Sequence, residues 1–394
     1  MKIKPCFKSL LPYIVAVSVT LSSVPIIAAA DGYESDYTDN SEYVSVSAPI
    51  GVSAASAILI DADSGTVLYE KDAHTRRPMA STTKITTALV ALENGNLSDT
   101  VTIPKEAVGV EGSSIYLYEK EKLTLEQLIY ALMLQSANDA ATAIAIHIAG
   151  SVENFASMMN DKAYDLGLTD TSYENPHGLD SENHYTTASD LAAITAKALQ
   201  NDTFRKIVST YKTTIPMNGG GVRLLINHNR LLRSYDGAIG VKTGYTKRCG
   251  RCLVTAAERD GVTLVAVTLN ASDDWNDHKR MLDYGFTQLE SILLSEESIS
   301  GCVDVVGGSA EKVKYTGDGQ LRVTLPKKEH DVRCVTELFR FYYAPIEKGE
   351  VLGRTVYYDG DTEIASIPLI CSETVEKRQE EHGFIAWIKS IFGK

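Results

Sequence analysis

Residues 139–149 form an alanine-rich run that is apolar on almost every side of a helical wheel. A helix without a polar face must be surrounded by protein, because it would otherwise expose apolar surface to water. Another helical pattern ends just before this run and begins at Thr124, which forms a capping box with Gln127. The chain must therefore fold into a domain whose other elements enclose a central helix.

Helix and strand patterns alternate around this run. Apolar residues at spacings of three and four predict an amphipathic helix that starts near Ser81 and ends at Asn94-Gly95. A turn at Arg259-Asp-Gly261 separates two apolar β-prone runs. These patterns indicate an α+β or mixed α/β domain. Strands are expected at 57–60, 66–69, 238–242, 252–257 and 262–270, and a late helix at 281–294.

Beyond about Ser298 the pattern changes to short β-prone runs separated by Gly and Asp turns. A chain of 394 residues is long enough for two domains. We therefore expect a larger domain at 53–295 and a small all-β domain at 298–372. The runs that predict its strands are 303–306, 321–325, 332–335 and 355–358.

The first thirty residues are typical of a secretory signal peptide. Lys2, Lys4 and Lys8 precede an apolar stretch, and Ala28-Ala-Ala30 supplies a cleavage site. The alternative is a transmembrane anchor, for which the stretch is short. Residues 31–52 are polar and predict a flexible leader. We expect a protein secreted across the cytoplasmic membrane.

The last residues, 376–394, predict an amphipathic helix. Its large apolar side chains share one side of the wheel, while Lys389 and Lys394 lie on the other. Such a helix is suited to the membrane interface and would attach the protein peripherally to the extracellular membrane surface. The alternative is a terminal helix docked on its own protein. The apolar residues are Phe384, Ile385, Trp387, Ile388, Ile391 and Phe392.

A net charge of -13 argues against a nucleic acid partner, which needs a basic surface. Five cysteines remain once the signal peptide with Cys6 is removed. The spacing Cys249-x-x-Cys252 admits a zinc or redox interpretation, but no second pair of ligands at metal spacing accompanies it. We favour structural, unpaired cysteines and expect no metal and no cofactor.

Three short motifs follow one another: Ser81-Thr-Thr-Lys84, Ser136-Ala-Asn138 and Lys242-Thr-Gly244. Ser81 and Lys84 are three residues apart at a helix start, so their side chains share one face. A serine hydroxyl needs a base to become a nucleophile, and an uncharged lysine can be that base. Burial and a neighbouring cation would both lower the pKa of Lys84.

The other two motifs fit a substrate cleft. Ser136 and Asn138 fall at a break between two helices, and Lys242 with Thr243 continues a strand. Gly244 on that strand allows a substrate backbone to approach closely. Taken singly, each motif can also be explained by a structural role without catalysis, as a helix cap, a polar group in a loop or a lysine on an edge strand. A Ser-His-Asp triad is the alternative chemistry, but the G-x-S-x-G motif is absent and His177 and His184 are better explained as loop residues.

The longer strings around the motifs resemble those of the low-molecular-mass penicillin-binding proteins that are serine-type D-alanyl-D-alanine carboxypeptidases. The resemblance covers about 53–294 and extends more weakly to the β domain and terminal helix. It implies an α+β fold of the β-lactamase and penicillin-binding-protein type, with an antiparallel sheet covered by helices. The strings are Arg77-Pro-Met-Ala-Ser-Thr-Thr-Lys-Ile85, Gln135-Ser-Ala-Asn-Asp-Ala140, His177-Gly-Leu-Asp180 and Lys242-Thr-Gly-Tyr-Thr246.

The resemblance also implies residue roles. Ser81 attacks the carbonyl between two terminal D-alanines of a peptidoglycan stem peptide, and Lys84 accepts its proton. Ser136 relays a proton to the leaving amine, and Asn138 holds the substrate and Lys84. The terminal carboxylate side binds Lys242, Thr243 and Gly244, and the N–H groups of Ser81 and Tyr245 form the oxyanion hole. β-Lactam antibiotics would acylate the same serine.

Arg248 and Arg223 are candidates for additional binding of the substrate carboxylate. The alternatives to a carboxypeptidase are a β-lactamase of the same fold and a non-catalytic cell-wall-binding protein. The Ser136-Ala-Asn138 form differs from the Ser-Asp-Asn of class A β-lactamases, which favours the carboxypeptidase.

Overall fold

The structure of the protein is a computed structural model that describes residues 50–378. The predicted signal peptide, nearly all of the leader and the terminal helix from residue 379 onward lie outside the described residues. The described chain divides into two compact units, one of residues 50–292 with 324–327 and one of 293–323 with 328–378. Each unit is described by itself.

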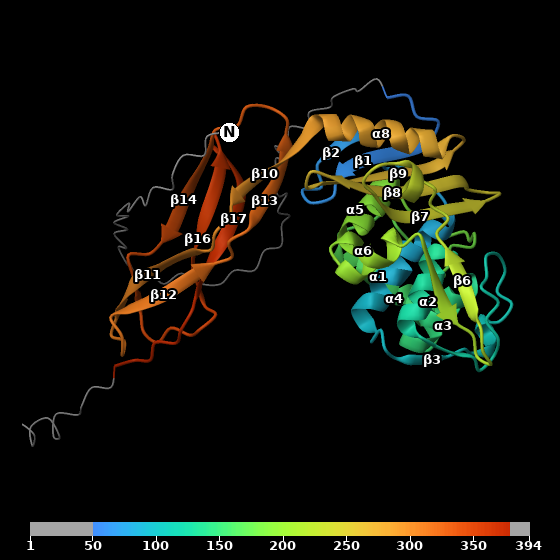
Figure 1. The fold of residues 1–394 in the computed structure, drawn as a ribbon, viewed down its shortest axis with the longest axis horizontal. Coiled ribbons are helices and arrows are strands. Elements are labelled where there is room, and N and C mark those ends of the chain that lie inside the picture. Colours follow the sequence, from blue (N-terminus) through green and yellow to red (C-terminus); the bar gives the residue numbers. More distant parts are fainter. Residues whose placement is uncertain (1–49, 379–394) are drawn as a thin grey trace, which may run out of the picture. The chain divides into compact units, whose positions relative to one another are not determined.

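The first unit is built on a five-stranded sheet with the order β2-β1-β9-β8-β7 (Figure 1). Every neighbouring pair of strands is antiparallel. The turn expected at 259–261 joins β8 to β9, and the strands expected at 57–60 and 66–69 correspond to the paired strands β1 and β2. Since β7 has one partner in the sheet, its second edge is open to other groups. The strands are β1 Ser56–Asp61, β2 Val67–Lys71, β7 Ala238–Thr246, β8 Gly250–Arg259 and β9 Val262–Ala271.

Helices cover both faces of this sheet (Figure 1). Side chains along β9 alternate between two apolar clusters, as a strand buried on both faces requires. Leu264 and Ala266 pack in the cluster shared with α8, Asp274–Gln288. Val265 and Val267 pack in the larger cluster with the remaining helices. The sheet is therefore the middle of three layers.

The larger helical layer encloses α3, Asn138–Ala149, whose first eight residues are buried. The prediction of a central buried helix is confirmed for these turns. The predicted capping box is also present: Gln127 N donates to Thr124 Oγ1 at 3.2 Å, and Thr124 N donates to Gln127 Oε1 at 2.9 Å. The other helices of this layer are α1 Lys84–Asn94, α2 Leu125–Leu134, α4 Val152–Asp165, α5 Ala188–Leu199 and α6 Asp202–Ser209, with short η1 Ala80–Thr83 and η2 Lys105–Ala107. A four-residue helix, α7 Leu231–Ser234, precedes β7.

Two small antiparallel strand pairs accompany this layer. β3 pairs with β4, and β5 pairs with β6, both antiparallel. Their bounds are β3 Thr100–Thr102, β4 Lys122–Thr124, β5 Lys212–Pro216 and β6 Val222–Ile226.

The helix predicted at 281–294 is wrong at both ends. Helix α8 starts seven residues earlier, at Asp274, in a polar stretch that carries no apolar repeat. It ends at Gln288, and the next residues form strand β10, Leu289–Ser295. Leu289, Ile292 and Leu293 have helix-like spacing, but β10 pairs with β13, Leu321–Pro326, and this distant pairing decides the conformation.

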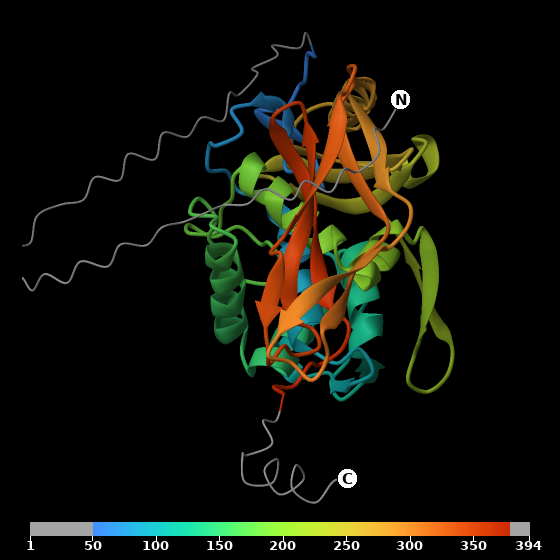
Figure 2. The same cartoon turned by 90° about the vertical axis from the view of Figure 1, so that its left-hand side faces the viewer.

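The second unit is all β. Its six-stranded sheet has the order β14-β16-β17-β12-β11-β15, with β16 and β17 as a long antiparallel pair (Figures 1 and 2). The four predicted runs lie in β11, β13, β14 and β16. The strands are β11 Ile299–Val306, β12 Lys312–Gly317, β14 Val332–Leu338, β15 Phe341–Tyr343, β16 Val351–Asp359 and β17 Thr362–Cys371.

Candidate active site

Ser81 lies in the short helix η1, which runs directly into α1. Lys84 begins α1 one turn later, so its side chain returns to the serine: Lys84 Nζ lies 2.9 Å from Ser81 Oγ. The lysine is completely buried, whereas the serine is partly exposed. The hydroxyl can thus meet a ligand from outside while its amine neighbour is shielded from water.

Lys84 Nζ has two further partners from distant parts of the chain. It donates to Asn138 Oδ1 at 2.7 Å and to the main-chain oxygen of His177 at 2.5 Å. Burial lowers the pKa of Lys84 well below its usual 10.5, and the positive charge of Lys242 lowers this pKa further. The carboxylate of Asp139 acts in the opposite direction and is the smaller influence. These surroundings favour an uncharged amine.

Asn138 opens helix α3, and its amide links two sides of the site. Oδ1 accepts from Lys84, while Nδ2 donates to the main-chain oxygen of Glu111 at 2.5 Å. Ser136, two residues earlier, has a left-handed backbone with φ of +58° and is buried. Its hydroxyl forms no hydrogen bond within the described part of the chain, so Asn138 is hydrogen-bonded to Lys84 whereas Ser136 is not.

Asp139 is a residue that the sequence analysis missed. Its buried carboxylate accepts from Ser114 Oγ at 2.6 Å and from Leu117 N at 3.0 Å. It thereby fixes the loop of residues 111–117, whose Glu111 oxygen holds Asn138. The sequence did contain a signal for this role: an acidic residue in the first turn of an otherwise apolar helix is buried, and a buried carboxylate needs hydrogen-bond donors around it.

Strand β7 brings the third motif to the same place. An added Cβ at Gly244 would lie 3.1 Å from Ser81 N, so the strand passes directly beside the serine. Lys242 is buried, and burial lowers the pKa of its amine to about 7. Its Nζ donates to the main-chain oxygen of Thr243 at 2.9 Å. Thr243 is partly buried, and Tyr245 is 67% exposed.

The loop that contains His177 and His184 is hydrogen-bonded to the helical segment that carries Ser81 and Lys84. His177 contributes its main-chain oxygen, and burial lowers the pKa of its ring to about 3. His184 Nδ1 accepts from Glu174 N at 3.0 Å, so its Nε2–H donates to Thr83 Oγ1 at 2.7 Å. Neither ring contacts Ser81 by a hydrogen bond in the described chain. The structure gives no Ser-His-Asp arrangement at this serine.

Comparison with known proteins decides the family. Residues 42–273 match the family model described as D-alanyl-D-alanine carboxypeptidase, and residues 292–377 match the C-terminal domain of penicillin-binding protein 5. The D-alanyl-D-alanine carboxypeptidase DacF of Bacillus subtilis is 34% identical over 351 residues, which is 86% of this chain and 89% of that protein. The chain belongs to the D-alanyl-D-alanine carboxypeptidase family.

Solved structures agree with this assignment. Penicillin-binding protein 5 from Haemophilus influenzae is 30% identical with a TM-score of 0.64, over 84% of this chain and 99% of that one. The Streptomyces K15 DD-transpeptidase is 38% identical with a TM-score of 0.57, over 60% of this chain and 98% of that one. The protein is therefore a serine-type D-alanyl-D-alanine carboxypeptidase, a hydrolase with the penicillin-binding fold. This removes the non-catalytic alternative.

The two arginines considered for carboxylate binding occupy different environments in this carboxypeptidase. Arg223 forms a two-pronged ion pair with the fully buried Glu121, at 2.5 and 2.9 Å, and its Nε donates to the main-chain oxygen of Ile115. A further bond from Arg223 Nη2 goes to the main-chain oxygen of Tyr116, so these four bonds tie the guanidinium to the protein and do not support it as a substrate ligand. Arg248 is exposed and donates to the Ser181 oxygen at 3.3 Å.

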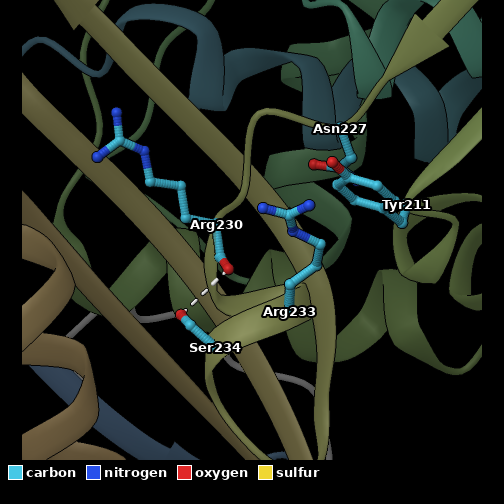
Figure 3. Close-up of a pocket in the computed structure, with 5 residues that line it drawn as sticks. All are labelled: Tyr211, Asn227, Arg230, Arg233 and Ser234. Atoms are coloured by element: carbon cyan, nitrogen blue, oxygen red, sulfur yellow. Dashed lines mark hydrogen bonds between the residues drawn. The ribbon is translucent and has the colours of Figure 1, made fainter.

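A hollow of about 620 Å³ lies elsewhere on this unit of the carboxypeptidase (Figure 3). The guanidinium of Arg233 points toward Tyr211 and Asn227, whereas that of Arg230 points away, and Ser234 bonds the Arg230 main-chain oxygen. None of the residues around Lys84 lines it, so the candidate site rests on the polar cluster and not on this hollow. Within residues 50–378 no three His, Cys, Asp or Glu side chains gather as metal ligands.

Proposed function

We propose that Ser81 is the nucleophile of this carboxypeptidase and that Lys84 is its general base. The family removes D-alanine from peptides that end in D-alanyl-D-alanine, and the substrate we propose here is the peptidoglycan stem peptide. The proposal is carried by one observation: a buried lysine amine 2.9 Å from a partly exposed serine hydroxyl.

Hydrogen-bond accounting at Lys84 supports the assignment. An uncharged amine has two N–H donors and one lone pair. Asn138 Oδ1 and the His177 main-chain oxygen can only accept, so they take the two N–H groups. The lone pair is then left for the remaining neighbour, the hydroxyl of Ser81. Acceptance of the serine proton is the arrangement that a general base needs.

The reaction then proceeds in two halves. Ser81 Oγ attacks the carbonyl carbon of the terminal peptide bond while its proton moves to Lys84 Nζ. The resulting oxyanion is stabilised by the N–H groups of Ser81 and Tyr245. The proton passes to the leaving amine through Ser136, D-alanine departs, and an ester remains on Ser81. Water hydrolyses this ester and restores the enzyme.

The open edge of β7 is the proposed place of the substrate backbone. A peptide lying along an edge strand gains main-chain hydrogen bonds, and Gly244 leaves room for it beside Ser81. Lys242 and Thr243 on the same strand would face its terminal carboxylate, and Asn138 its amide. A β-lactam antibiotic would enter the same groove and acylate Ser81.

Labelling with a fluorescent penicillin tests the nucleophile. Wild-type protein and Ser157→Ala, a control at an exposed serine of α4, should take up label equally, and Ser81→Ala should take up none. D-Alanine release from diacyl-L-Lys-D-Ala-D-Ala should disappear in the same variant. Equal labelling of Ser81→Ala would refute the assignment, and rapid turnover of benzylpenicillin in place of a lasting adduct would favour a β-lactamase.

We also propose that the protein is exported and attached peripherally to the extracellular membrane surface. The sequence pattern of residues 1–30 supports export, and the amphipathic pattern of 376–394 supports attachment. The unit at 53–295 would carry catalysis, and in the sequence the β unit at 298–372 comes after it and before the membrane segment. Among the described residues no helix is both long and apolar enough to cross a bilayer.

Deletion of residues 376–394 tests this attachment. The shortened protein should leave the membrane fraction and keep its activity on the small peptide. Replacing Trp387 and Phe392 by serine in the full chain should have the same effect, because it removes apolar area from one side of the helix. Unchanged membrane association of either variant would contradict the proposal.

A further inference from the structure

Two cysteines lie at the end of the hairpin that carries the third motif. Cys249 is in the turn between β7 and β8, and Cys252 is in β8. Their sulfur atoms are 3.9 Å apart, and both residues are buried. The other described cysteines, Cys302, Cys334 and Cys371, belong to the second unit. The mechanism above uses neither Cys249 nor Cys252.

Hydrogen bonds make the two thiols unequal. Cys249 Sγ accepts from Thr246 N at 3.3 Å and from the thiol of Cys252. The bond from Cys252 and the bonds from Thr246 lower the pKa of Cys249 to about 7 despite burial. The same contact and burial raise the pKa of Cys252. We therefore expect Cys249 to attack first and Cys252, whose sulfur lies 3.9 Å away, to resolve the product.

The spacing of the pair fits closure of a bond. A disulfide needs a sulfur separation of about 2.05 Å, so the sulfurs must approach by about 2 Å. Cys249 lies in a turn next to the exposed Lys247 and Arg248, where such a movement and the entry of a small reagent need only local opening. No other acidic, histidine or cysteine ligand completes a metal site with this pair among the described residues.

We propose that Cys249 and Cys252 are a redox modification site, which closes into a disulfide by exchange with a small disulfide and thereby slows acylation of Ser81. In the first step the Cys249 thiolate attacks one sulfur of the reagent and expels the other as a thiolate. In the second step Cys252 loses its proton and attacks Cys249 sulfur, expelling the second reagent thiolate. The protein dithiol loses two electrons and two protons, and the reagent disulfide becomes two thiols.

The cysteine pair is linked to the active site through strand β7. Cys252 is the strand partner of Gly244, and Gly244 passes beside Ser81 N. Closure also takes the sulfur acceptor from Thr246 N, the residue directly after Tyr245. Both changes act on the segment of β7 proposed to hold the substrate and the oxyanion. The effect on rate rests on the proposed function of Ser81, whereas formation of the disulfide does not.

Treatment of the folded full-length protein with glutathione disulfide tests the proposal. Arg251 separates the two cysteines, so trypsin releases 249–251 and 252–259 as separate peptides when the thiols are reduced. We expect these two peptides to be joined after treatment, in wild type and in Cys302→Ser, which removes an exposed thiol. Cys252→Ser should instead keep one glutathione on Cys249, because it lacks the second thiol that would displace the glutathione.

The rate measurement uses acylation by fluorescent penicillin. The oxidised protein should react at least threefold more slowly and should recover its rate on reduction with dithiothreitol. The rate of Cys249→Ser should not change on treatment with glutathione disulfide. Absence of the joined peptides would overturn the modification site, and joined peptides with an unchanged rate would overturn its control of acylation. Absence of labelling in both redox states would count against the proposed function of Ser81.

Discussion

The main-chain oxygen of His177 accepts a hydrogen bond from Lys84 Nζ at 2.5 Å. Thr87 Oγ1 in α1 donates to the oxygen of the preceding residue, Pro176, at 2.6 Å. The loop is thus bonded to the same helix that carries the lysine, and it holds one N–H of the amine in a fixed direction. The direction of the lone pair toward Ser81 depends on this loop as much as on Asn138.

The pH dependence of acylation should report the charge on Lys84. The rate of reaction with benzylpenicillin should rise with pH as Lys84 loses its proton, with a midpoint well below 10.5. Lys242→Met removes a positive charge that lowers the pKa of Lys84, so the midpoint should move to higher pH. The measurement is the second-order acylation rate between about pH 5 and 10.

The matched control for this shift is Lys247→Met, an exposed lysine of the same hairpin. It should leave both the rate and the midpoint unchanged. Lys242→Met is expected to lose rate at every pH as well, because Lys242 is proposed to bind substrate. A lower rate with an unmoved midpoint would show that Lys242 does not act on the charge of Lys84.

Gly178 should tolerate no side chain, because it lies against the residue that precedes Ser81. An added Cβ would be 1.9 Å from the main-chain oxygen of Ala80, and the φ of Gly178 is +87°. Gly178→Ala should therefore lower the free energy of unfolding by about 3 kcal/mol or more and slow acylation at least about tenfold. Urea unfolding and penicillin labelling measure the two effects.

The variant Gly167→Ala measures the effect of an unfavourable backbone conformation without a steric clash, and so serves as the control for Gly178→Ala. Gly167 has a similar φ of +73°, with no atom within 4 Å of the added Cβ. Its substitution should cost about 1 kcal/mol and leave acylation unchanged. Equal effects of the two substitutions would mean that the contact between Gly178 and Ala80 is unimportant.

The sequence was sufficient to predict those structural features that are determined by residues close together in the chain. The capping box of Thr124, the turn at 259–261 and the Ser81–Lys84 spacing all need only a few consecutive residues. The helix end at Gln288 was missed because the pairing of β10 with β13 joins segments more than 25 residues apart. The His177 oxygen was missed for a different reason: every residue has a main-chain carbonyl, so no side chain signals its role.

Breaking the buried ion pair between Glu121 and Arg223 should be costly. Arg223→Met leaves a fully buried carboxylate without its partner and should reduce the free energy of unfolding by about 3–5 kcal/mol. The double variant Arg223→Met/Glu121→Leu should recover most of this loss, because no charge remains buried. Urea unfolding of the single and double variants measures both.

Arg76→Met is the matched control for Arg223. Arg76 pairs with Asp170 at 2.7 Å, but both side chains are about half exposed, so the loss should be below about 1 kcal/mol. If Arg223→Met were as stable as wild type and instead lost affinity for the peptide substrate, the original suggestion that Arg223 binds the carboxylate would be restored.

Buried histidines should make the fold sensitive to acid. Burial lowers the pKa of His278 to about 3 and that of His184 to about 4, whereas both rings titrate near 6.5 in the unfolded chain. Between these values the unfolded state binds more protons than the folded state, so stability falls as the pH drops below about 6.5. Each ring should contribute a slope of roughly 1.4 kcal/mol per pH unit in this window.

His278→Gln isolates one of these contributions. His278 Nε2 lies 2.9 Å from Thr268 Oγ1, a contact that glutamine can retain without titrating. The free energy of unfolding measured between about pH 6 and 4 should therefore fall less steeply than in wild type, by roughly 1.4 kcal/mol per pH unit. His74→Gln, at a side chain 73% exposed, should leave the slope as it is. An unchanged slope in His278→Gln would mean that this ring is protonated in the folded protein, and that its burial does not oppose the charge.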